Sequence, residues 1–273
     1  MTRYTAAIFD IDGTLAMMDK ATGTYEALPG AIEAMEACRA RGMEVIAYTN
    51  GTFFPPAHYD PRLADAGIMV EAGKLLTPAV VGAARMAAMG IKRAMVLGGD
   101  GTAVPMQDAG IEVVAPTAEN AKDVEAVMLG YTSDFGAAEL EAVVQAVWAG
   151  AKPFAGSVAP YFAGAGGRLL GISGAIAAAL ENATEVPVTV FGKPEAAGLE
   201  MAAEMTGAAF ADMIVIGDDP KLEIVMARRA GAFAIGVTTG IRDEAAFNAA
   251  PEGDRANVVI PTLENFGAQP WME

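Results

Sequence analysis

The sequence has a single cysteine, Cys38, and a single histidine, His58, among its 273 residues. One cysteine excludes an internal disulfide, and we interpret Cys38 as a small buried residue on a helix rather than a catalytic thiol. One histidine excludes a metal site built from several histidines. His58 lies in the stretch FFPPAHYD, which is typical of a loop, and no motif around it supports a Ser-His-Asp triad.

Basic residues are also scarce, with 18 Lys and Arg against 34 Asp and Glu, a net charge of −16. This balance disfavours nucleic acid or an anionic membrane as the main partner and suits a cation cofactor. No uninterrupted apolar run reaches about 18 residues, so we expect no membrane span. No signal peptide is visible, because an acidic, strand-like segment begins almost at once. We therefore expect a cytoplasmic protein.

Apolar, strand-like runs alternate with alanine-rich helical patterns. Helices are indicated by GAIEAMEACRARG, with Gly42 as its stop, and by PEAAGLEMAAEMTG. Continuous apolar strands separated by helices are typical of a parallel sheet covered on both faces, which predicts an α/β fold. The strands expected in this sheet are AAIFDI, MEVIAYTN, VTVFG, DMIVIGDD, FAIGVTT and NVVIPTL.

The middle of the chain has an alternation of its own. Strands are indicated by RAMVLGG, IEVVAP and VEAVMLGY, and helices by AAELEAVVQAVWAG and SGAIAAALENA. We predict that residues 79–187 form a second α/β domain, inserted into a core made of residues 1–78 and 188–273. The glycine-rich stretch FAGAGGRLLGISG is the most loop-like part of the insert.

Two carboxylates, Asp10 and Asp12, stand at the end of the first apolar run, in the stretch IFDIDGTL. Residues two apart on a strand share a side, so both can face one site. They lie at the carboxyl end of the strand, where open α/β sheets bind ligands. Asp12-Gly13 taken alone is typical of a turn. A turn leaves Asp10 unexplained, because a buried carboxylate is costly unless it is paired, hydrogen-bonded or bound to metal.

Two further motifs follow apolar runs. EVIAYTNG ends in Thr49, Asn50 and Gly51, whose hydroxyl, amide and backbone N–H groups can cradle an oxyanion. Taken alone, Asn-Gly is a turn signal. VFGKPE carries Lys193, which taken alone is typical of a surface lysine.

The fourth motif, IVIGDDPKLEI, places Asp218 and Asp219 at the end of another apolar run. Asp219 has the position of a helix N-cap ahead of Pro220, with Glu223 favourable in the first turn. That role for Asp219 is compatible with metal binding by Asp218.

The order DIDGTL, TNG, GKP and GDD resembles the haloacid dehalogenase superfamily. The inserted domain resembles that of the subfamily with nitrophenylphosphatases, pyridoxal phosphate phosphatase and phosphoglycolate phosphatase. The resemblance implies a Rossmann-like core with an α/β cap. It also implies a Mg²⁺-dependent phosphatase that hydrolyses a small phosphorylated metabolite through an aspartyl-phosphate. Relatives often dimerise through the cap, which leaves a homodimer as an open alternative.

The resemblance also implies roles for individual residues. Asp10 is the expected nucleophile and Asp12 the expected general acid and base, which a dehalogenase lacks. The expected phosphate-binding residues are Thr49, Asn50, Gly51 and Lys193, and the expected Mg²⁺ ligands are Asp10, the carbonyl of Asp12, and Asp218. Asp219 and Glu223 are candidates for metal support, although the family commonly has an aspartate where Glu223 stands. The insert lacks the usual TNxD-like loop, which leaves Tyr161 and Arg168 as candidate substrate contacts.

Two alternatives stay open. The stretch GGDGT, residues 98–102, resembles a signature of diacylglycerol and NAD kinases, but it lies inside the insert without the rest of either kinase. We interpret it as a glycine turn between a strand and a helix. The second alternative is a phospho-accepting signalling or phosphate-binding protein with little turnover. Asp12 disfavours it, because a long-lived switch needs no group dedicated to hydrolysis.

Overall fold

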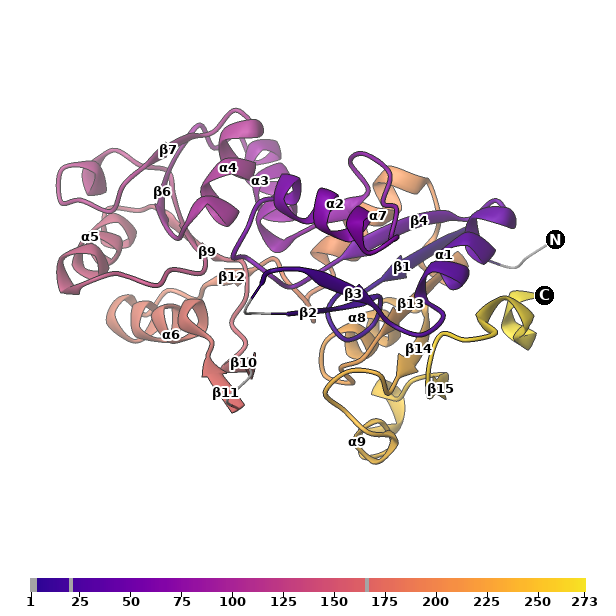
Figure 1. Cartoon of the computed structure of the whole chain (residues 1–273). Coiled ribbons are helices and arrows are strands. Elements are labelled where there is room, and N and C mark those ends of the chain that lie inside the picture. The colour runs from indigo at the N-terminus through magenta and orange to yellow at the C-terminus, as the bar shows by residue number, and fades with distance from the viewer. Residues whose placement is uncertain (1–3, 20–21, 165–166) are drawn as a thin grey trace. The chain divides into compact units, whose positions relative to one another are not determined.

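The computed structural model describes residues 4–19, 22–164 and 167–273 (Figure 1). It divides into two compact units. The core unit comprises Met1–Thr49, His58–Leu76 and Lys193–Glu273, and the inserted unit comprises Asn50–Ala57 and Thr77–Gly192. Each unit has a parallel sheet with helices packed on it, which confirms the predicted α/β class.

The core unit has a six-stranded parallel sheet in the order β15-β14-β13-β1-β4-β5. Its strands are β1 (Ala6–Phe9), β4 (Glu44–Tyr48), β5 (Leu75–Leu76), β13 (Met213–Gly217), β14 (Phe233–Val237) and β15 (Val258–Ile260). Its helices are α1 (Ala31–Ala40), α2 (Pro56–Asp65), α7 (Ala197–Thr206), α8 (Glu223–Ala230) and α9 (Glu244–Asn248). An antiparallel hairpin of β2 (Ala16–Met18) and β3 (Tyr25–Ala27) follows β1.

The strand β1 shows why these runs are apolar throughout. All four of its residues are buried. Ala7 and Phe9 join a core cluster with the buried residues of α1, such as Met35. Side chains alternate along a strand, so Ile8 points to the other face, where α7 packs on β4 and α8 packs on β13 and β14. Both faces are covered, and a polar residue on either face would lose its water without gaining a partner.

The inserted unit has a five-stranded parallel sheet in the order β12-β9-β8-β6-β7. Its strands are β6 (Arg93–Leu97), β7 (Glu112–Val114), β8 (Ala126–Leu129), β9 (Lys152–Ala155) and β12 (Thr189–Val190). Its helices are α3 (Pro78–Ala88), α4 (Asp100–Asp108), α5 (Ala137–Trp148) and α6 (Ile172–Thr184). Buried residues of β6, β8, α5 and α6 form its hydrophobic core.

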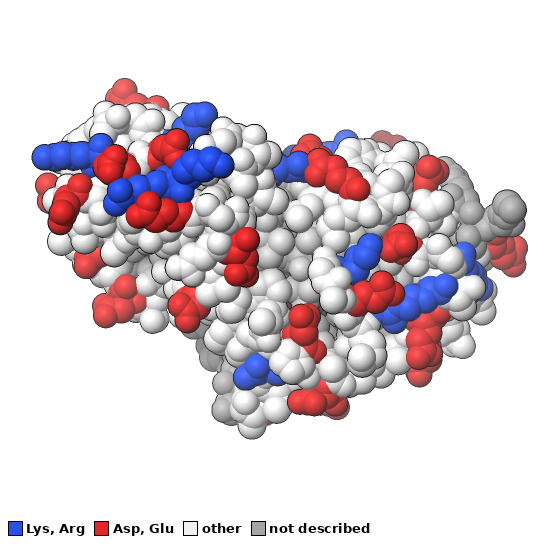
Figure 2. Space-filling model, turned by 90° about the horizontal axis from the view of Figure 1, so that it is seen from above, with Lys and Arg blue, Asp and Glu red and all other residues white. Residues whose placement is uncertain are grey.

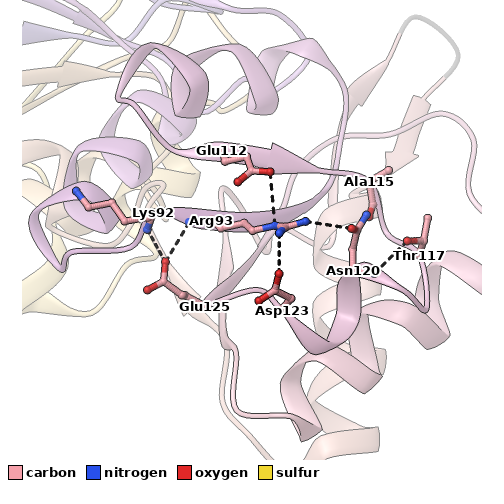
Figure 3. Close-up of polar contacts among 8 residues, drawn as sticks. All are labelled: Lys92, Arg93, Glu112, Ala115, Thr117, Asn120, Asp123 and Glu125. Carbon is pink, nitrogen blue, oxygen red and sulfur yellow. Dashed lines mark hydrogen bonds and ion pairs between the residues drawn. The ribbon is translucent and has the colours of Figure 1, made fainter.

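A polar network ties the amino-terminal ends of these strands together (Figure 3). The Glu125 carboxylate accepts hydrogen bonds from the backbone N–H groups of Lys92 and Arg93, at 2.5 and 3.0 Å. The Arg93 guanidinium lies 2.7 Å from Asp123 and 3.7 Å from Glu112 on the neighbouring strand. These two backbone hydrogen bonds lower the pKa of Glu125 below its usual value. The carboxylates of the network are exposed, and the half-buried Arg93 guanidinium is paired with them within the unit, so we assign the network to strand alignment.

Three sequence-based expectations need correction. VTVFG was predicted in the core, but β12 pairs with Phe154 and Ala155 of β9, so the chain leaves the inserted unit at Gly192 rather than at residue 187. Pairing partners far apart in sequence are not encoded locally. The loop-like stretch after Pro160 contains an antiparallel hairpin of β10 (Tyr161–Gly164) and β11 (Gly167–Leu170). The glycines of this stretch hid the strand pattern from sequence analysis, because glycine has a low strand propensity.

The third correction concerns His58, which lies in α2 and not in a loop. Two prolines in the sequence predict a break, but proline is tolerated in the first turn of a helix. The backbone carbonyl of His58 accepts a hydrogen bond from Arg62, one turn later, at 2.9 Å. Burial and the nearby Arg62 lower the pKa of His58.

Charged side chains of both signs lie on the face of the molecule drawn in Figure 2. Figure 2 shows Lys and Arg side chains interspersed with Asp and Glu over the face that it draws. Within the described ranges, no helix combines the length and the apolar character needed to cross a bilayer.

Candidate active site

The carboxyl ends of two adjacent strands carry the central carboxylates. Asp10 directly follows β1, and Asp218 directly follows its neighbour β13. Each is only 6% exposed. The backbone N–H of Asp10 donates to the carbonyl of Ile216 at 2.9 Å, which continues the sheet pairing up to the site. The two motifs DIDGTL and GDD, about 200 residues apart in sequence, therefore meet at one sheet edge.

Lys193 is buried among acceptors at this edge and is 3% exposed. Its Nζ atom lies 2.5 Å from Oδ1 of Asp10, 2.6 Å from Oε1 of Glu223 and 2.9 Å from the carbonyl oxygen of Tyr48. An ammonium group has three N–H donors, so all three have a protein acceptor. Burial alone would lower the pKa of Lys193, but the two carboxylates outweigh it and raise that pKa above its usual value. Lys193 is therefore a fixed positive charge.

The carboxylates outnumber this charge. Burial raises the pKa of Asp10, against the opposing effect of Lys193, and the charge of Asp12 raises it further. Burial and the carboxylates of Asp10 and Glu223 raise the pKa of Asp218 to about 8.

Two glycines pack closely against the Asp218 carboxylate. A Cβ atom on Gly13 would lie 2.6 Å from Oδ2 of Asp218, and one on Gly240 would overlap the same oxygen. Gly13 also has a φ of +92°, which glycine adopts without strain. The Asp12-Gly13 turn is thus present, and it packs directly against the Asp218 carboxylate, where no larger residue would fit. Oδ2 of Asp218 also accepts a hydrogen bond from the Ile241 N–H at 3.0 Å.

Both carboxylate oxygens of Glu223 have a partner. Oε1 pairs with Lys193, and Oε2 accepts from the N–H of Asp219 at 3.2 Å. A Cβ atom on Gly217 would lie 2.8 Å from Oε2 and would overlap Cγ, so Gly217 makes room for this longer side chain. Burial and the carboxylate of Asp10 raise the pKa of Glu223 to about 7, although Lys193 opposes them.

The predicted N-cap role of Asp219 is wrong. The helix α8 begins at Glu223 and not after Pro220. Oδ1 of Asp219 accepts instead from the N–H of Lys221 at 2.8 Å, and Oδ2 lies 3.7 Å from Nε of Arg242. The Asp219 side chain therefore stabilises a tight turn, and the helix begins at Glu223 instead of at Pro220.

Asp12 and Thr49 lie just beyond the carboxyl ends of β1 and β4. Asp12 is exposed. The pKa values of Tyr25 and Tyr59 are raised mainly by the burial of their own side chains and, second, by the charge of Asp12. Asp12 therefore lies near two largely buried phenols of the core unit. Thr49 is buried directly after β4, and its N–H donates to the carbonyl of Leu76 at 3.1 Å.

The remaining predicted residues lie in the inserted unit. Asn50 and Gly51 are its first two residues, and Tyr161 begins β10 as a half-buried residue. Arg168 pairs with Ala163 in the hairpin, and its side chain lies outside the described residues. In the described part of the chain, no group of three His, Cys, Asp or Glu side chains is arranged to hold a metal ion by itself.

Sequence reasoning missed Tyr48. Besides its carbonyl contact, its ring lies with its centroid 5.1 Å from Nζ of Lys193, a cation–π distance. Gly198 of α7 packs against this ring, where a Cβ atom would lie 2.5 Å from the phenol oxygen. A large aromatic residue directly before Thr49 was the available signal.

Open parallel α/β sheets bind ligands at the carboxyl edge, which is where the buried carboxylates and Lys193 of this chain lie. Comparisons with known proteins assign it further. The sequence model described as haloacid dehalogenase-like hydrolase matches residues 7–112, and a second one, HAD-hydrolase-like, matches residues 190–266. The chain is 30% identical to haloacid dehalogenase-like hydrolase domain-containing protein 2 of Bos taurus, over 90% of each chain. It belongs to the haloacid dehalogenase-like hydrolases.

Two further relatives are informative. The chain is 23% identical to the dihydroxyacetone phosphatase of Corynebacterium glutamicum, over 90% of this chain and 85% of that protein. It also matches the structure of a glycerol phosphate phosphatase from Mycobacterium tuberculosis in complex with magnesium, with a TM-score of 0.82 and 24% identity. That match covers 95% of this chain and 76% of the other, and it shows a shared fold.

Proposed function

We propose that this protein is a Mg²⁺-dependent phosphatase that hydrolyses a small phosphomonoester through an aspartyl-phosphate. The observation that carries the proposal is the buried pair of Lys193 and Asp10, 2.5 Å apart, with Asp218 on the adjacent strand. A carboxylate held beside a fixed positive charge can act as a nucleophile toward a phosphate group. The family membership and the phosphatases among the relatives support the same reaction.

The proposed reaction has two steps. First, an oxygen of Asp10 attacks phosphorus and the bond to the alcohol oxygen breaks, while Asp12 gives that oxygen a proton. Asp12 then takes a proton from water, whose oxygen attacks the phosphorus of the aspartyl-phosphate. Inorganic phosphate leaves and the Asp10 carboxylate is restored. Splitting one difficult displacement into two steps lowers the barrier of each.

The charge balance of the cluster fits a divalent cation. Four buried carboxyl groups face one buried lysine among the described residues. The raised pKa of Asp218 reflects this excess, because the neighbouring carboxylates of Asp10 and Glu223 contribute to it. Mg²⁺ takes oxygen ligands and uses few protein carboxylates, keeping waters and substrate oxygens. Asp10, Asp218 and the backbone carbonyl of Asp12 would hold it, and the bound ion would offset the repulsion between Asp10 and a phosphate dianion.

The other predicted residues have roles in the same proposal. Thr49, Asn50 and Gly51 would bind the phosphoryl oxygens together with Lys193. Glu223 acts on Lys193, since its carboxylate is already used there and at Asp219. The inserted unit would serve as a cap that excludes water and selects the substrate, with Tyr161 and Arg168 as candidate contacts.

The test is phosphate release from nitrophenyl phosphate. We expect turnover with Mg²⁺, loss of turnover in excess EDTA, and recovery when Mg²⁺ is restored. Asp10→Asn should abolish turnover while the protein stays folded. Full activity in EDTA would contradict the metal assignment. One phosphoryl group taken up per protein without release would instead support the phospho-accepting alternative.

A further inference from the structure

The segment Asn50–Ala57 follows the core strand β4 in sequence, yet it packs within the inserted unit. Thr52 makes the central contact of this segment. Its side chain is 5% exposed, and its hydroxyl accepts a hydrogen bond from the backbone N–H of Tyr131 at 3.1 Å. Tyr131 lies just beyond β8, about 80 residues along the chain, so this is a tertiary contact and not a local turn.

The GGDGT stretch forms the surface on which the segment packs. A Cβ atom on Gly101 would lie 2.6 Å from the carbonyl carbon of Phe53 and 2.6 Å from the backbone nitrogen of Phe54, and it would overlap the carbonyl oxygen of Thr52. The backbone of the segment therefore lies directly against the first turn of α4. Gly99, two residues earlier, differs, because a Cβ atom there would meet only Tyr131 at an ordinary 3.7 Å.

Two further contacts hold the segment in place. The rings of Phe53 and Tyr131 are 3.9 Å apart between centroids. At the other end, a Cβ atom on Gly192 would lie 2.6 Å from Oδ1 of Asn50 and would overlap the carbonyl oxygen of Gly156. Asn50 is thus packed against the residue that precedes Lys193. The chain itself therefore packs against the GGDGT stretch. This contact explains why a glycine stands at position 101, and no bound nucleotide is needed to explain it.

We propose that Thr52 and Gly101 are positioning residues, through which the inserted unit sets the geometry of the phosphate-binding residues Asn50 and Gly51. The proposal rests on the proposed function. Asn50 and Gly51 form a two-residue link between buried Thr49 of the core unit and buried Thr52 of the inserted unit. Because Thr52 and Asn50 are held by contacts within the inserted unit, the amide and the N–H groups of this link lose freedom, and preorganised donors bind an anion at a lower entropic cost.

The test compares two matched pairs of variants. Gly101→Ala places a methyl group against the segment, and Gly99→Ala adds the same group to the same stretch without that overlap. Thr52→Val removes the hydroxyl that Tyr131 needs and keeps the shape, and Thr52→Ser keeps the hydroxyl. For each protein we would measure binding of inorganic phosphate by calorimetry in the presence of Mg²⁺, kcat and KM for nitrophenyl phosphate, and the thermal midpoint.

We expect Gly101→Ala and Thr52→Val to weaken phosphate binding about tenfold, the factor that corresponds to one neutral hydrogen bond. KM should rise with the phosphate dissociation constant. Gly99→Ala and Thr52→Ser should stay within about twofold of the wild type on the same scale. If Gly101→Ala fails to fold, the Thr52 pair decides the question.

The outcomes separate this proposal from the proposed function. A wild-type protein that hydrolyses nitrophenyl phosphate, with unchanged phosphate binding in folded Gly101→Ala and Thr52→Val, overturns the positioning proposal alone. A lower thermal midpoint with unchanged phosphate binding also overturns it, because that result marks a purely structural role. A wild-type protein that neither hydrolyses the ester nor binds phosphate overturns both proposals.

Discussion

Oε1 of Glu223 lies 2.6 Å from Nζ of Lys193, and both side chains are almost completely buried. The contact depends on the length of the glutamate side chain and on the room that Gly217 leaves beside it. An aspartate, which the family commonly has here, is one methylene shorter. The chain therefore uses this position to hold the lysine of the cluster.

Replacing Glu223 should affect activity and stability together. Glu223→Gln leaves one acceptor oxygen for two buried donors, Lys193 and the N–H of Asp219, which should lower the free energy of unfolding by about 1–3 kcal/mol. We expect kcat/KM to fall about tenfold, since Lys193 loses one of its fixed partners. Urea unfolding and steady-state kinetics would measure both, with the exposed Glu36→Gln as the matched control. An Asp at position 223 should not restore the lysine contact, and wild-type activity in Glu223→Asp would contradict this account.

Asp12→Asn should separate the two proposed steps. Asparagine keeps the shape and the backbone carbonyl, but it cannot give or take a proton. Nitrophenolate needs little protonation to leave, so Asp10 should still be phosphorylated, whereas hydrolysis of the intermediate should slow by about 10²–10⁴-fold. Rapid mixing should show a burst of nearly one nitrophenolate per protein, with phosphate retained on the quenched protein. Steady turnover at the wild-type rate without a burst would leave Asp12 as a turn residue only.

Stability without metal should fall as the pH rises. The folded pKa of Asp218 is about 8 against an ordinary value of 3.8, so the folded state binds the proton more tightly than the unfolded state. The contribution of this group is complete below about pH 4 and is lost progressively toward pH 8. Glu223, with a pKa of about 7, acts in the same direction.

This pH dependence can be measured by urea unfolding in EDTA at several values between pH 5 and pH 8. Asp218→Asn should flatten the decline, and the exposed Asp65→Asn should not. Added Mg²⁺ should restore stability most at the upper end of the range, because an ion bound only by the folded state stabilises it by mass action. If the free energy of unfolding fell equally steeply with pH in the wild type and in Asp218→Asn, a raised pKa of Asp218 would be excluded.

The packing of Tyr48 against Gly198 should be sensitive to a single methyl group. Gly198→Ala would place Cβ against the phenol ring beside Lys193, and such overpacking typically costs about 1–3 kcal/mol. Helix propensity acts in the opposite direction by about 1 kcal/mol. We expect a net loss of stability and a lower kcat, measured against Gly253→Ala, where the added methyl group meets open space. A more stable variant with unchanged kcat would show that the ring position does not matter.

Much of the core was predictable because it depends on local pattern. Apolar runs such as AAIF and MIVIG are buried on both faces, and this burial excludes polar residues along the whole strand. The carboxyl end of each run is also visible, since Asp10 and Asp218 interrupt the apolar pattern at the first residue beyond their strands. The strands β1, β4 and β13 are neighbours in one sheet, so three of the four motifs end at the same edge, whereas the motif of Lys193 follows β12 of the inserted unit.

Pairing and packing between distant segments were decided only by the tertiary structure. The strand β12 has the same apolar character as a core strand, and only its register with β9 assigns it to the inserted unit. Likewise, Gly101 looks like a turn glycine until the backbone of Phe53 and Phe54 is found against it. The sequence by itself determined the apolar runs that become buried strands and the carboxylates that end them, because burial and charge of this kind are properties of each local pattern. Which partners they meet was decided by the three-dimensional packing, because contact energies depend on segments that the local sequence does not contain.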